Sequence, residues 1–157
     1  ICTIWLWYAI PKKMKIKLIV TVVCIFWGSL SMAQDIQGKW KTFNKHTGEV
    51  RSIIEVFEKD QKIYGRVFQI MDPEDKDNLC TACEGADKNK KIEGLVLIKN
   101  FKKEGDEYVD GTITNPDNGK VYDSKLWIDD ENPNILHVRG YIGIFYKTME
   151  WERLKTM

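Results

Sequence analysis

The fold is decided by residues 50–71, whose sequence is VRSIIEVFEKDQKIYGRVFQIM. Two runs rich in β-branched and aromatic residues, Val50–Lys59 and Lys62–Met71, are separated by the pair Asp60-Gln61. Such runs on either side of a two-residue connection predict a β-hairpin, although Asp-Gln is not a favoured turn pair. A connection of this length fixes which residues lie opposite one another, so the two faces of the hairpin can be told apart.

One face of this hairpin is expected to lie in water and the other in the core. Glu55 falls opposite Arg66 on the first face, and a charged cross-strand pair belongs in water. Ile54 falls opposite Val67 on the second face, which is therefore predicted to point inward. The second face also carries Ser52, Val56, Ile63, Gly65 and Gln69.

Short strand-like segments fill the rest of the chain, and no stretch has a convincing helical period. The further strands are expected at Ile36–Phe43, Ile92–Phe101, Glu107–Thr114, Lys120–Asp129, Ile135–Ile142 and Phe145–Leu154. Ile92–Phe101 is almost continuously apolar, as expected for a strand buried on both sides. Eight antiparallel strands in sequence order predict an all-β, up-and-down barrel, which leaves no exposed edge. A barrel of this size is either filled by side chains or holds one small ligand.

Residues 14–33 have the pattern of a signal peptide. A charged start at Met14 is followed by the apolar run Leu18–Trp27 and by small residues up to Ala33. We expect cleavage after Ala33 and a mature protein in the periplasm or outside the cell, which meets the membrane only during export. Residues 1–13 are interpreted as a non-native upstream extension; the alternative is an uncleaved anchor.

Residues 34–157 have a length suited to a single domain. Removal of residues 1–33 takes away four lysines and no acid, which leaves 20 Lys and Arg against 23 Asp and Glu and a net charge of −3. Nucleic-acid binding rests on basic patches, so this balance gives no case for a nucleic-acid partner.

The connection Asp72–Lys91 is polar, irregular and contains the two cysteines of the mature chain, Cys80 and Cys83. A thioredoxin-type site would need a helix after a parallel strand, and a zinc site would need two more ligands. The two histidines, His46 and His137, are single and far apart in the sequence. Because disulfides persist outside the cytoplasm, a structural Cys80–Cys83 bond is favoured over both alternatives, and we expect no metal and no cofactor.

Several polar side chains are predicted to point into the barrel and to form a candidate pocket. Counting across the Asn115–Gly119 turn places four of them on one face, and the other strands supply the rest. The candidates are Ser52, Gln69, Tyr108, Asp110, Tyr122, Ser124 and Lys147. Buried polar groups need partners, so they form either a structural network or a ligand pocket, and an ion pair of Lys147 with Asp110 suits both alternatives.

No catalytic residue is assigned. His137 falls opposite Glu150, but both are expected on the outward face, where a solvated cross-strand pair is favoured over an acid–base pair. Arg139 and Tyr141 are expected on the same outward face and could form a surface for a partner.

Two sets of residues carry a resemblance to known families. Gly38-Lys39-Trp40, with Arg153 in the last strand, resembles the calycin arrangement of lipocalin-type barrels, in which a tryptophan closes the barrel floor and an arginine packs across it. The mature chain more specifically resembles the bacterial family DUF2147, whose function is unknown. The matching blocks are residues 38–40, 79–85, 115–122, 138–143 and 151–153. This resemblance implies an exported, lipocalin-like barrel and no established activity; at Lys147 the family often has arginine.

Three functions are considered. The first is a non-enzymatic binding protein that holds a small polar or amphipathic ligand in the barrel cup. The second is an envelope interaction module that acts through its outer face and the Cys80–Cys83 loop. The third and weakest is a hydrolase-like or redox enzyme that uses the inward carboxylate and tyrosines. An internal cavity with an open mouth would favour the first function, and a filled interior with an exposed aromatic patch would favour the second.

Overall fold

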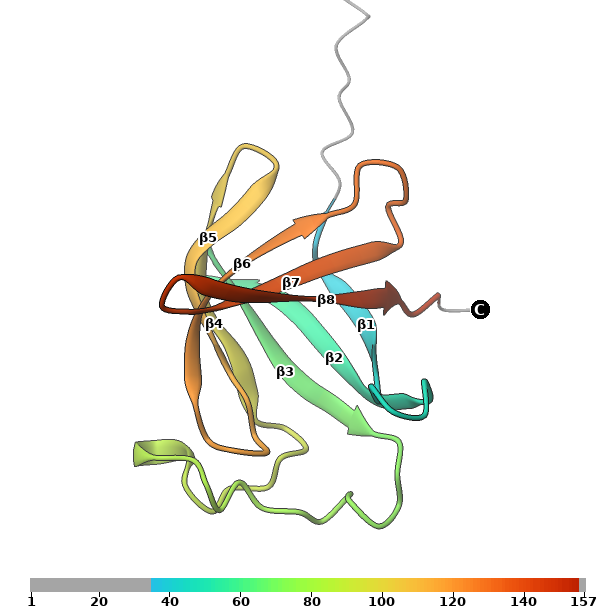
Figure 1. The fold of residues 1–157 in the computed structure, drawn as a ribbon, viewed down its shortest axis with the longest axis vertical. Coiled ribbons are helices and arrows are strands. Elements are labelled where there is room, and N and C mark those ends of the chain that lie inside the picture. Colours follow the sequence, from blue (N-terminus) through green and yellow to red (C-terminus); the bar gives the residue numbers. More distant parts are fainter. Residues whose placement is uncertain (1–34, 156–157) are drawn as a thin grey trace, which may run out of the picture. The chain divides into compact units, whose positions relative to one another are not determined.

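The computed structural model describes residues 35–155, and Figure 1 shows its fold. The predictions about residues 1–33 and the processing site fall outside this range. The strands are β1 (Gly38–Phe43), β2 (Val50–Lys59), β3 (Lys62–Ile70), β4 (Val96–Glu104), β5 (Glu107–Thr114), β6 (Val121–Ile128), β7 (Ile135–Ile142) and β8 (Phe145–Arg153). A single 3₁₀ turn, η1 (Gly85–Asp87), lies in the connection between β3 and β4. None of the helices in the described part of the chain is long and apolar enough to span a membrane.

The eight strands form one closed barrel in which each strand pairs with the next and β8 returns to β1. The predicted up-and-down, antiparallel barrel is therefore confirmed. Because successive strands reverse direction, the first, third, fifth and seventh connections follow the strand ends that lie opposite the chain's entry into β1. These are the β1–β2, β3–β4, β5–β6 and β7–β8 connections; in Figure 1 the β3–β4 and β5–β6 connections lie at the lower end and the β7–β8 tip projects at the left.

The β2–β3 hairpin has the predicted register. Glu55 pairs with Arg66 in the strand ladder, and their side chains form an ion pair at 2.6 Å on the outer face. The turn residues Asp60 and Gln61 both have positive φ, 51° and 59°, as a type I′ turn requires. The backbone therefore takes the favoured hairpin geometry with a residue pair that seldom forms it. The last hairpin also has the expected register, with Leu136 opposite Trp151.

Two β-bulges correct the predicted faces of β3 and β5. Between Ile54–Val67 and Ile53–Gln69 the β3 strand holds one extra residue, so Ile70 turns inward and Gln69 is exposed. In β5 the pairs Tyr108–Leu126 and Gly111–Ser124 enclose another extra residue. Asp110 lies in this bulge with φ 57°, and its side chain is 61% exposed. One extra residue reverses the alternation, so the predicted inward position of Gln69 and of Asp110 is wrong.

The expected strand Ile92–Phe101 is also corrected. The strand begins at Val96, and Ile92–Leu95 belongs to the connection that precedes it. Leu97, Ile98 and Phe101 are buried, whereas Lys99 and Asn100 face outward. The continuous apolar run therefore reflects a connection that packs on the barrel followed by a one-sided strand, and not a strand buried on both faces.

The largest fully buried side chains fill one end of the barrel, which we call the floor. They include Ile36, Trp40, Phe101, Leu126 and Leu136. The ring of Phe101 packs so closely over Gly111 that a Cβ there would lie 2.1 Å from a ring carbon, so only glycine fits. Aromatic rings set on a glycine leave no room for a ligand at the floor.

Candidate functional site

The opposite end of the barrel encloses a cavity of about 710 Å³, which we call the cup. Its deep wall is apolar, and the side chains come from five strands and the β3–β4 connection. They are Ile54, Val67, Ile70, Ile92, Leu97, Ile113, Met149 and Trp151. Alternation along antiparallel strands turns these residues inward, and the bulge in β3 brings Ile70 into the set. An apolar wall of this kind can hold a hydrocarbon group out of water.

Polar and charged side chains form the rim of the cup. Lys45 lies in the β1–β2 turn, Arg51 is the second residue of β2, Asp117 lies in the β5–β6 turn and Lys147 lies in β8. Arg51 donates two hydrogen bonds to the Asp117 carboxylate, at 2.9 and 2.5 Å. This contact raises the pKa of Arg51 and lowers the pKa of Asp117, although burial opposes the shift in both. The two charges of this pair therefore largely cancel each other.

The seam between β1 and β8 is short and borders the cup. The two strands are in register at Trp40–Arg153 and Lys41–Glu152, and the Leu154 N–H also bonds the Lys39 carbonyl. Beyond these pairs the strands diverge toward the rim, where Thr42 and Phe43 of β1 and residues 147–151 of β8 all line the cavity. The two strands lie side by side near the seam in Figure 1. The β1–β8 ladder therefore stops short of the rim of the cup.

The structure brings together three of the predicted pocket residues. Ser52, Tyr122 and Lys147 line the cup. The Ser52 hydroxyl lies 2.8 Å from that of Thr42, and the Tyr122 hydroxyl accepts a hydrogen bond from Asn118 at 3.3 Å. These partners hold both side chains in place without closing the cavity.

The other four predicted pocket residues lie elsewhere. Tyr108 is buried, and burial is the main cause that raises its pKa. Ser124 is buried and donates to the carbonyl of Tyr122 at 3.1 Å. Asp110 pairs with Lys102 at 3.3 Å on the outside, so the proposed contact with Lys147 does not form. Gln69 is exposed, as described above.

At the floor, Trp40 and Arg153 lie against each other. Trp40 is 0% exposed and its indole N–H donates to the Ile36 carbonyl at 2.9 Å. The Arg153 guanidinium lies 4.2 Å from the centre of the indole ring and donates to the carbonyls of Gln37 and Asp35, at 2.9 and 2.7 Å. Burial lowers the pKa of Arg153. This contact ties the segment before β1 across the closed end of the barrel.

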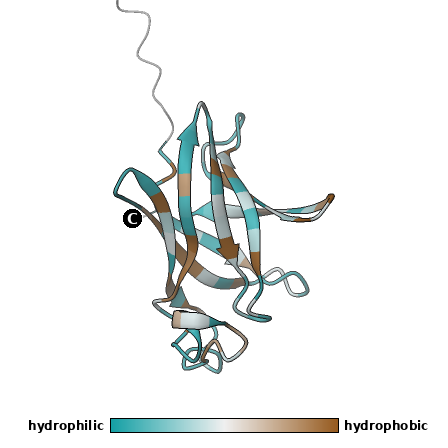
Figure 2. Cartoon of the chain, turned by 90° about the vertical axis from the view of Figure 1, so that its left-hand side faces the viewer, coloured by the Kyte–Doolittle hydropathy of each residue, from teal (hydrophilic) through white to brown (hydrophobic). Residues whose placement is uncertain are grey.

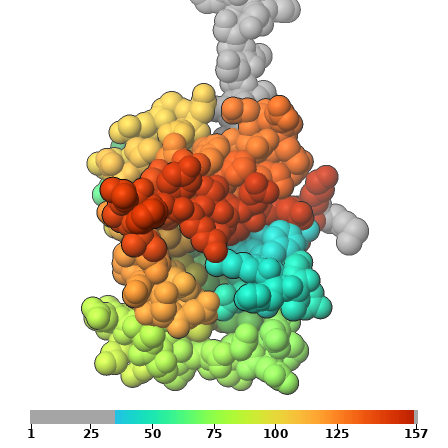
Figure 3. All heavy atoms as spheres, viewed as in Figure 1, coloured from blue at the N-terminus to red at the C-terminus, as the bar shows by residue number. Residues whose placement is uncertain are grey.

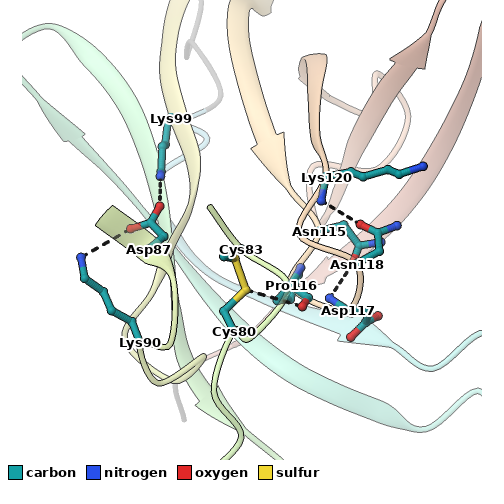
Figure 4. The surroundings of a disulfide bond; sticks show 10 residues. All are labelled: Cys80, Cys83, Asp87, Lys90, Lys99, Asn115, Pro116, Asp117, Asn118 and Lys120. Carbon is teal, nitrogen blue, oxygen red and sulfur yellow. Dashed lines mark hydrogen bonds and ion pairs between the residues drawn. A yellow bond between two sulfur atoms is a disulfide. The ribbon is translucent and has the colours of Figure 1, made fainter. Parts of the chain in front are cut away.

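The β3–β4 connection holds a Cys80–Cys83 disulfide with a Cα–Cα distance of 5.3 Å (Figure 4). Both cysteines are buried, and the Cys80 sulfur lies 3.6 Å from the Pro116 carbonyl oxygen of the β5–β6 turn. A Cβ at Gly119, in the same turn, would lie 1.8 Å from the Ala82 carbonyl oxygen. The cysteine loop is therefore packed directly on the β5–β6 turn.

Ion pairs and backbone bonds close the rest of this connection. Lys91 pairs with Asp77 at 2.7 Å, and Asp87 accepts from both Lys90 and Lys99. The Lys99 contact is the main cause that lowers the pKa of Asp87, and the Lys91 contact does the same for Asp77. In Figure 3 the connection, in green, covers the lower end of the barrel. Its residues Asp75, Asn78 and Ile92 line the cup, so the connection forms part of the wall of the cavity.

His137 lies on the outer face opposite Glu150, as predicted, but its side chain is largely buried and not solvated. Its side chain is 14% exposed, stacks on Trp127 with ring centres 4.9 Å apart, and bonds Asp129 through Nε2 at 2.9 Å. That bond is the main cause that lowers the pKa of Asp129. Glu150 lies 4.0 Å from the other ring nitrogen. Arg139 packs between the rings of Trp127 and Tyr146 on the same face. The Nε2 atom of His137 is therefore hydrogen-bonded, whereas its Nδ1 atom is buried without a hydrogen-bond partner.

The sequence analysis missed Lys45, Arg51 and Asp117. Lys45 and Asp117 lie in turns that were treated only as connections, and Arg51 was not examined as a rim residue. Alternation along a strand carries no information about which turns meet at one end. The barrel topology carries that information, because every second connection of an up-and-down barrel lies at the same end. Within residues 35–155, no group of three or more histidine, cysteine or acidic residues is arranged to hold a metal ion.

Comparison with known proteins agrees with this architecture. Protein HP1028 from the human pathogen Helicobacter pylori, described as belonging to the lipocalin family, has a similar fold, with a TM-score of 0.66 and 21% sequence identity. The match covers 77% of this chain and 84% of that chain. No functionally curated protein matches the chain. The family described as an uncharacterized protein conserved in bacteria (DUF2147) matches residues 38–153. The chain therefore belongs to the DUF2147 family, and its fold is a lipocalin-like barrel.

Proposed function

We propose that the protein is an exported binding protein that holds one small amphipathic ligand in the cup. The observation that carries this proposal is the cavity of about 710 Å³ at one end of an otherwise filled barrel. A volume of this order is typical of small-molecule sites, and an apolar wall with a few polar groups at the mouth suits a ligand with two unlike ends. The lipocalin-like fold supports the same function in a general sense.

The arrangement of the cup orients the ligand. The apolar residues of the deep wall, such as Ile54 and Ile113, would bury the hydrocarbon part, and the charged rim would keep the polar part near water. The enzyme alternative relied on an inward carboxylate at Asp110, which lies outside the barrel. Binding without chemical conversion uses the features of the cup and needs no reacting group.

The test is to fill the cup and to measure binding of an uncharged fluorescent probe, N-phenyl-1-naphthylamine. Ile113→Trp places an indole in the cavity, where it takes up space that the probe would otherwise fill. Because the probe then buries less apolar surface, we expect its affinity to fall by at least about tenfold. Thr112→Trp, on the outer face of the same strand, is the matched control. Equal binding to the two variants and to the wild type, or no binding at all, would contradict the proposal.

Export is part of the proposal and has its own test. The composition of residues 14–33 and the Cys80–Cys83 pair both suit a protein outside the cytoplasm. The intact mass of the exported protein should correspond to a chain that begins at Gln34. A membrane-bound form that keeps Met14 would contradict it. Native mass spectrometry of the same material would identify a ligand that remains bound during purification.

A specific observation also favours the second candidate function, an interaction module that acts through the outer face. The tip of the β7–β8 hairpin projects from the barrel with a hydrophobic end (Figure 2). The exposed side chains there are Ile142, Ile144, Phe145 and Tyr146, and Ile144 is 91% exposed. Exposed apolar groups of this kind mark contact sites. A photo-crosslinker at Ile144 should then give a protein adduct of defined mass in the exported protein, whereas one at Lys59, at the opposite end, should not.

A further inference from the structure

We propose that Lys45 and Lys147 bind the anionic head group of a single-chain amphiphile at the rim of the cup. This inference rests on the proposed function, because it names the class of ligand that the cup accepts. The head group is a carboxylate or a phosphate, two chemistries that share negative charge and acceptor oxygens. The hydrocarbon chain would lie along the apolar wall below the two lysines.

The first argument is the position of the two lysines. Lys45 comes from the β1–β2 turn and Lys147 from β8, so the neighbouring strands β1 and β8 bring both residues to the rim. Both residues line the same cavity as Ile54, Leu97 and Met149. A ligand whose hydrocarbon chain lies along the apolar wall can therefore place its head group beside both amino groups.

The second argument is the repulsion between the two amino groups. The pKa of Lys45 is lowered, chiefly because its neutral amine can accept a hydrogen bond from the Lys147 ammonium, and then because of burial. Direct charge repulsion from Lys147 and from Arg51 acts in the same direction, while the Asp117 carboxylate opposes it. Two cations in this position favour an anion between them, because the anion turns a repulsive contact into two attractive ones.

The third argument is that the acids of the rim are engaged elsewhere. Asp117 forms a two-bond contact with Arg51, and Asp75 accepts a hydrogen bond from Asn78 within the β3–β4 connection. The Glu150 carboxylate is turned to the outer face, where it lies 4.0 Å from His137. Among the described residues, no carboxylate lies within 4.0 Å of the amino group of Lys45 or Lys147. The rim therefore has positive charge that the folded chain does not neutralise.

The overall charge of the protein does not account for such a preference. Residues 34–157 have a net charge of −3, so long-range attraction would favour cations over anions. A preference for anions must therefore come from the charged side chains at the rim of the cup. This makes the head-group preference a specific readout of the Lys45–Lys147 pair.

The experiment measures how well amphiphiles of equal chain length displace N-phenyl-1-naphthylamine from the wild-type protein. The competitors are dodecanoate, dodecyl phosphate, dodecanol and dodecylammonium, each below its micelle concentration and at low and high salt. We expect the two anions to bind at least about tenfold more tightly than the alcohol, and the ammonium to bind most weakly. Dodecanoate and dodecyl phosphate distinguish a carboxylate from a phosphate as the preferred head group. Acetate and inorganic phosphate alone should displace no probe.

The double variant Lys45→Gln/Lys147→Gln should lose the preference for anions while it keeps its affinity for the uncharged probe. Lys45→Glu/Lys147→Glu should reverse the preference, so that dodecylammonium binds more tightly than dodecanoate. The matched control is Lys59→Gln/Lys62→Gln, which removes a facing pair of lysines from the β2–β3 turn at the opposite end of the barrel. This control changes the net charge by the same amount and should behave as the wild type does.

The outcomes separate the two proposals. If the probe does not bind, or if Ile113→Trp leaves its binding unchanged, the cup is not a binding site and both proposals fail. If the probe binds in the cup but the four competitors rank equally, or if the glutamate variant keeps the wild-type order, the lysine pair does not select an anion and only this inference is overturned. Retained probe binding by the lysine variants establishes that they are folded.

Discussion

The two ends of the barrel use the same alternating strands for opposite purposes. At the floor, Trp40, Phe101 and their neighbours fill the interior completely, and Arg153 closes the end. At the cup, smaller aliphatic side chains leave about 710 Å³ unfilled under a charged rim. Closely packed side chains stabilise the folded protein through dispersion and the hydrophobic effect, whereas side chains that line a cavity lack part of these contacts. The difference teaches that stability should depend on the floor and ligand binding on the cup, and the predictions below test this division.

The largest effect is expected from Trp40→Ala. The substitution removes a fully buried indole, its hydrogen bond to Ile36 and the surface on which Arg153 packs, so it should cost about 3–5 kcal/mol of unfolding free energy. Met149→Ala, in the wall of the cup, should cost clearly less, about 1 kcal/mol, because the space beside it is already open. Denaturant titration of both variants provides the comparison. Equal losses would mean that the two ends do not differ in the way described.

The next effect concerns the contact between the cysteine loop and the β5–β6 turn. Gly119→Ala forces a methyl group against the Ala82 carbonyl at a positive φ of 70°, and should cost about 3 kcal/mol. Gly48→Ala is the control, because Gly48 has φ 75° but nothing near its Cβ position, so only the backbone cost of about 1 kcal/mol applies. Thermal unfolding of the two variants measures both losses of stability. A control that is as unstable as Gly119→Ala would show that the close contact contributes nothing.

A smaller effect is expected from the disulfide. Replacing Cys80 and Cys83 with serine opens a very short ring, for which chain entropy predicts a loss of only about 2 kcal/mol. The barrel should stay folded while the connection at residues 72–91, part of the cup wall, becomes easier to cleave. Limited proteolysis with mapping of the first cut tests this. The wild-type protein, denatured without reductant, should contain no free thiol at either position; two free thiols would contradict a stable bond.

The smallest effect is the pH dependence of the Arg51–Asp117 pair at the rim. Because Arg51 lowers the folded-state pKa of Asp117, the pair's contribution is present above the unfolded-state pKa, about 4, and is lost as the pH falls through the lower folded-state pKa. Partial exposure keeps this contribution below about 1 kcal/mol. Asp117→Asn should therefore be slightly less stable than the wild type at pH 7, and the gap should close as the pH falls through the lowered folded-state pKa of Asp117. A gap that persists in acid would mean that the carboxylate charge is not its source.

Much of the fold could be predicted because short turns transmit the register. The β2–β3 and β7–β8 hairpins each turn through two residues, so counting from the turn gives the right partners for Glu55 and for Trp151. The same counting fails once a strand holds an extra residue. The bulges near Gln69 and at Asp110 reverse the alternation; Gly111 follows the second bulge, but no glycine marks the first. These two bulges account for the errors at Gln69 and Asp110, whereas Tyr108 and Ser124 are buried but do not line the cup.

The composition of the rim could not be predicted for a different reason. Lys45, Asp117 and Lys147 come from separate connections and strands, and only the closed barrel brings them to one end. The sequence analysis found Lys147 because it lies in a strand with a recognisable face. Charges in turns have no such pattern, so their meeting depends on tertiary structure.

The short seam between β1 and β8 has a consequence for the protein at high concentration. Their ladder has two residue pairs, whereas β7 and β8 share eight, so part of each strand lies outside the β1–β8 ladder. Free strand edges are templates on which other chains add strands, and proteins limit this with short edges and with lysine. The edge of β1 ends within a few residues, and Lys147 lies on the facing edge. We expect these features to protect the protein from aggregation at this seam.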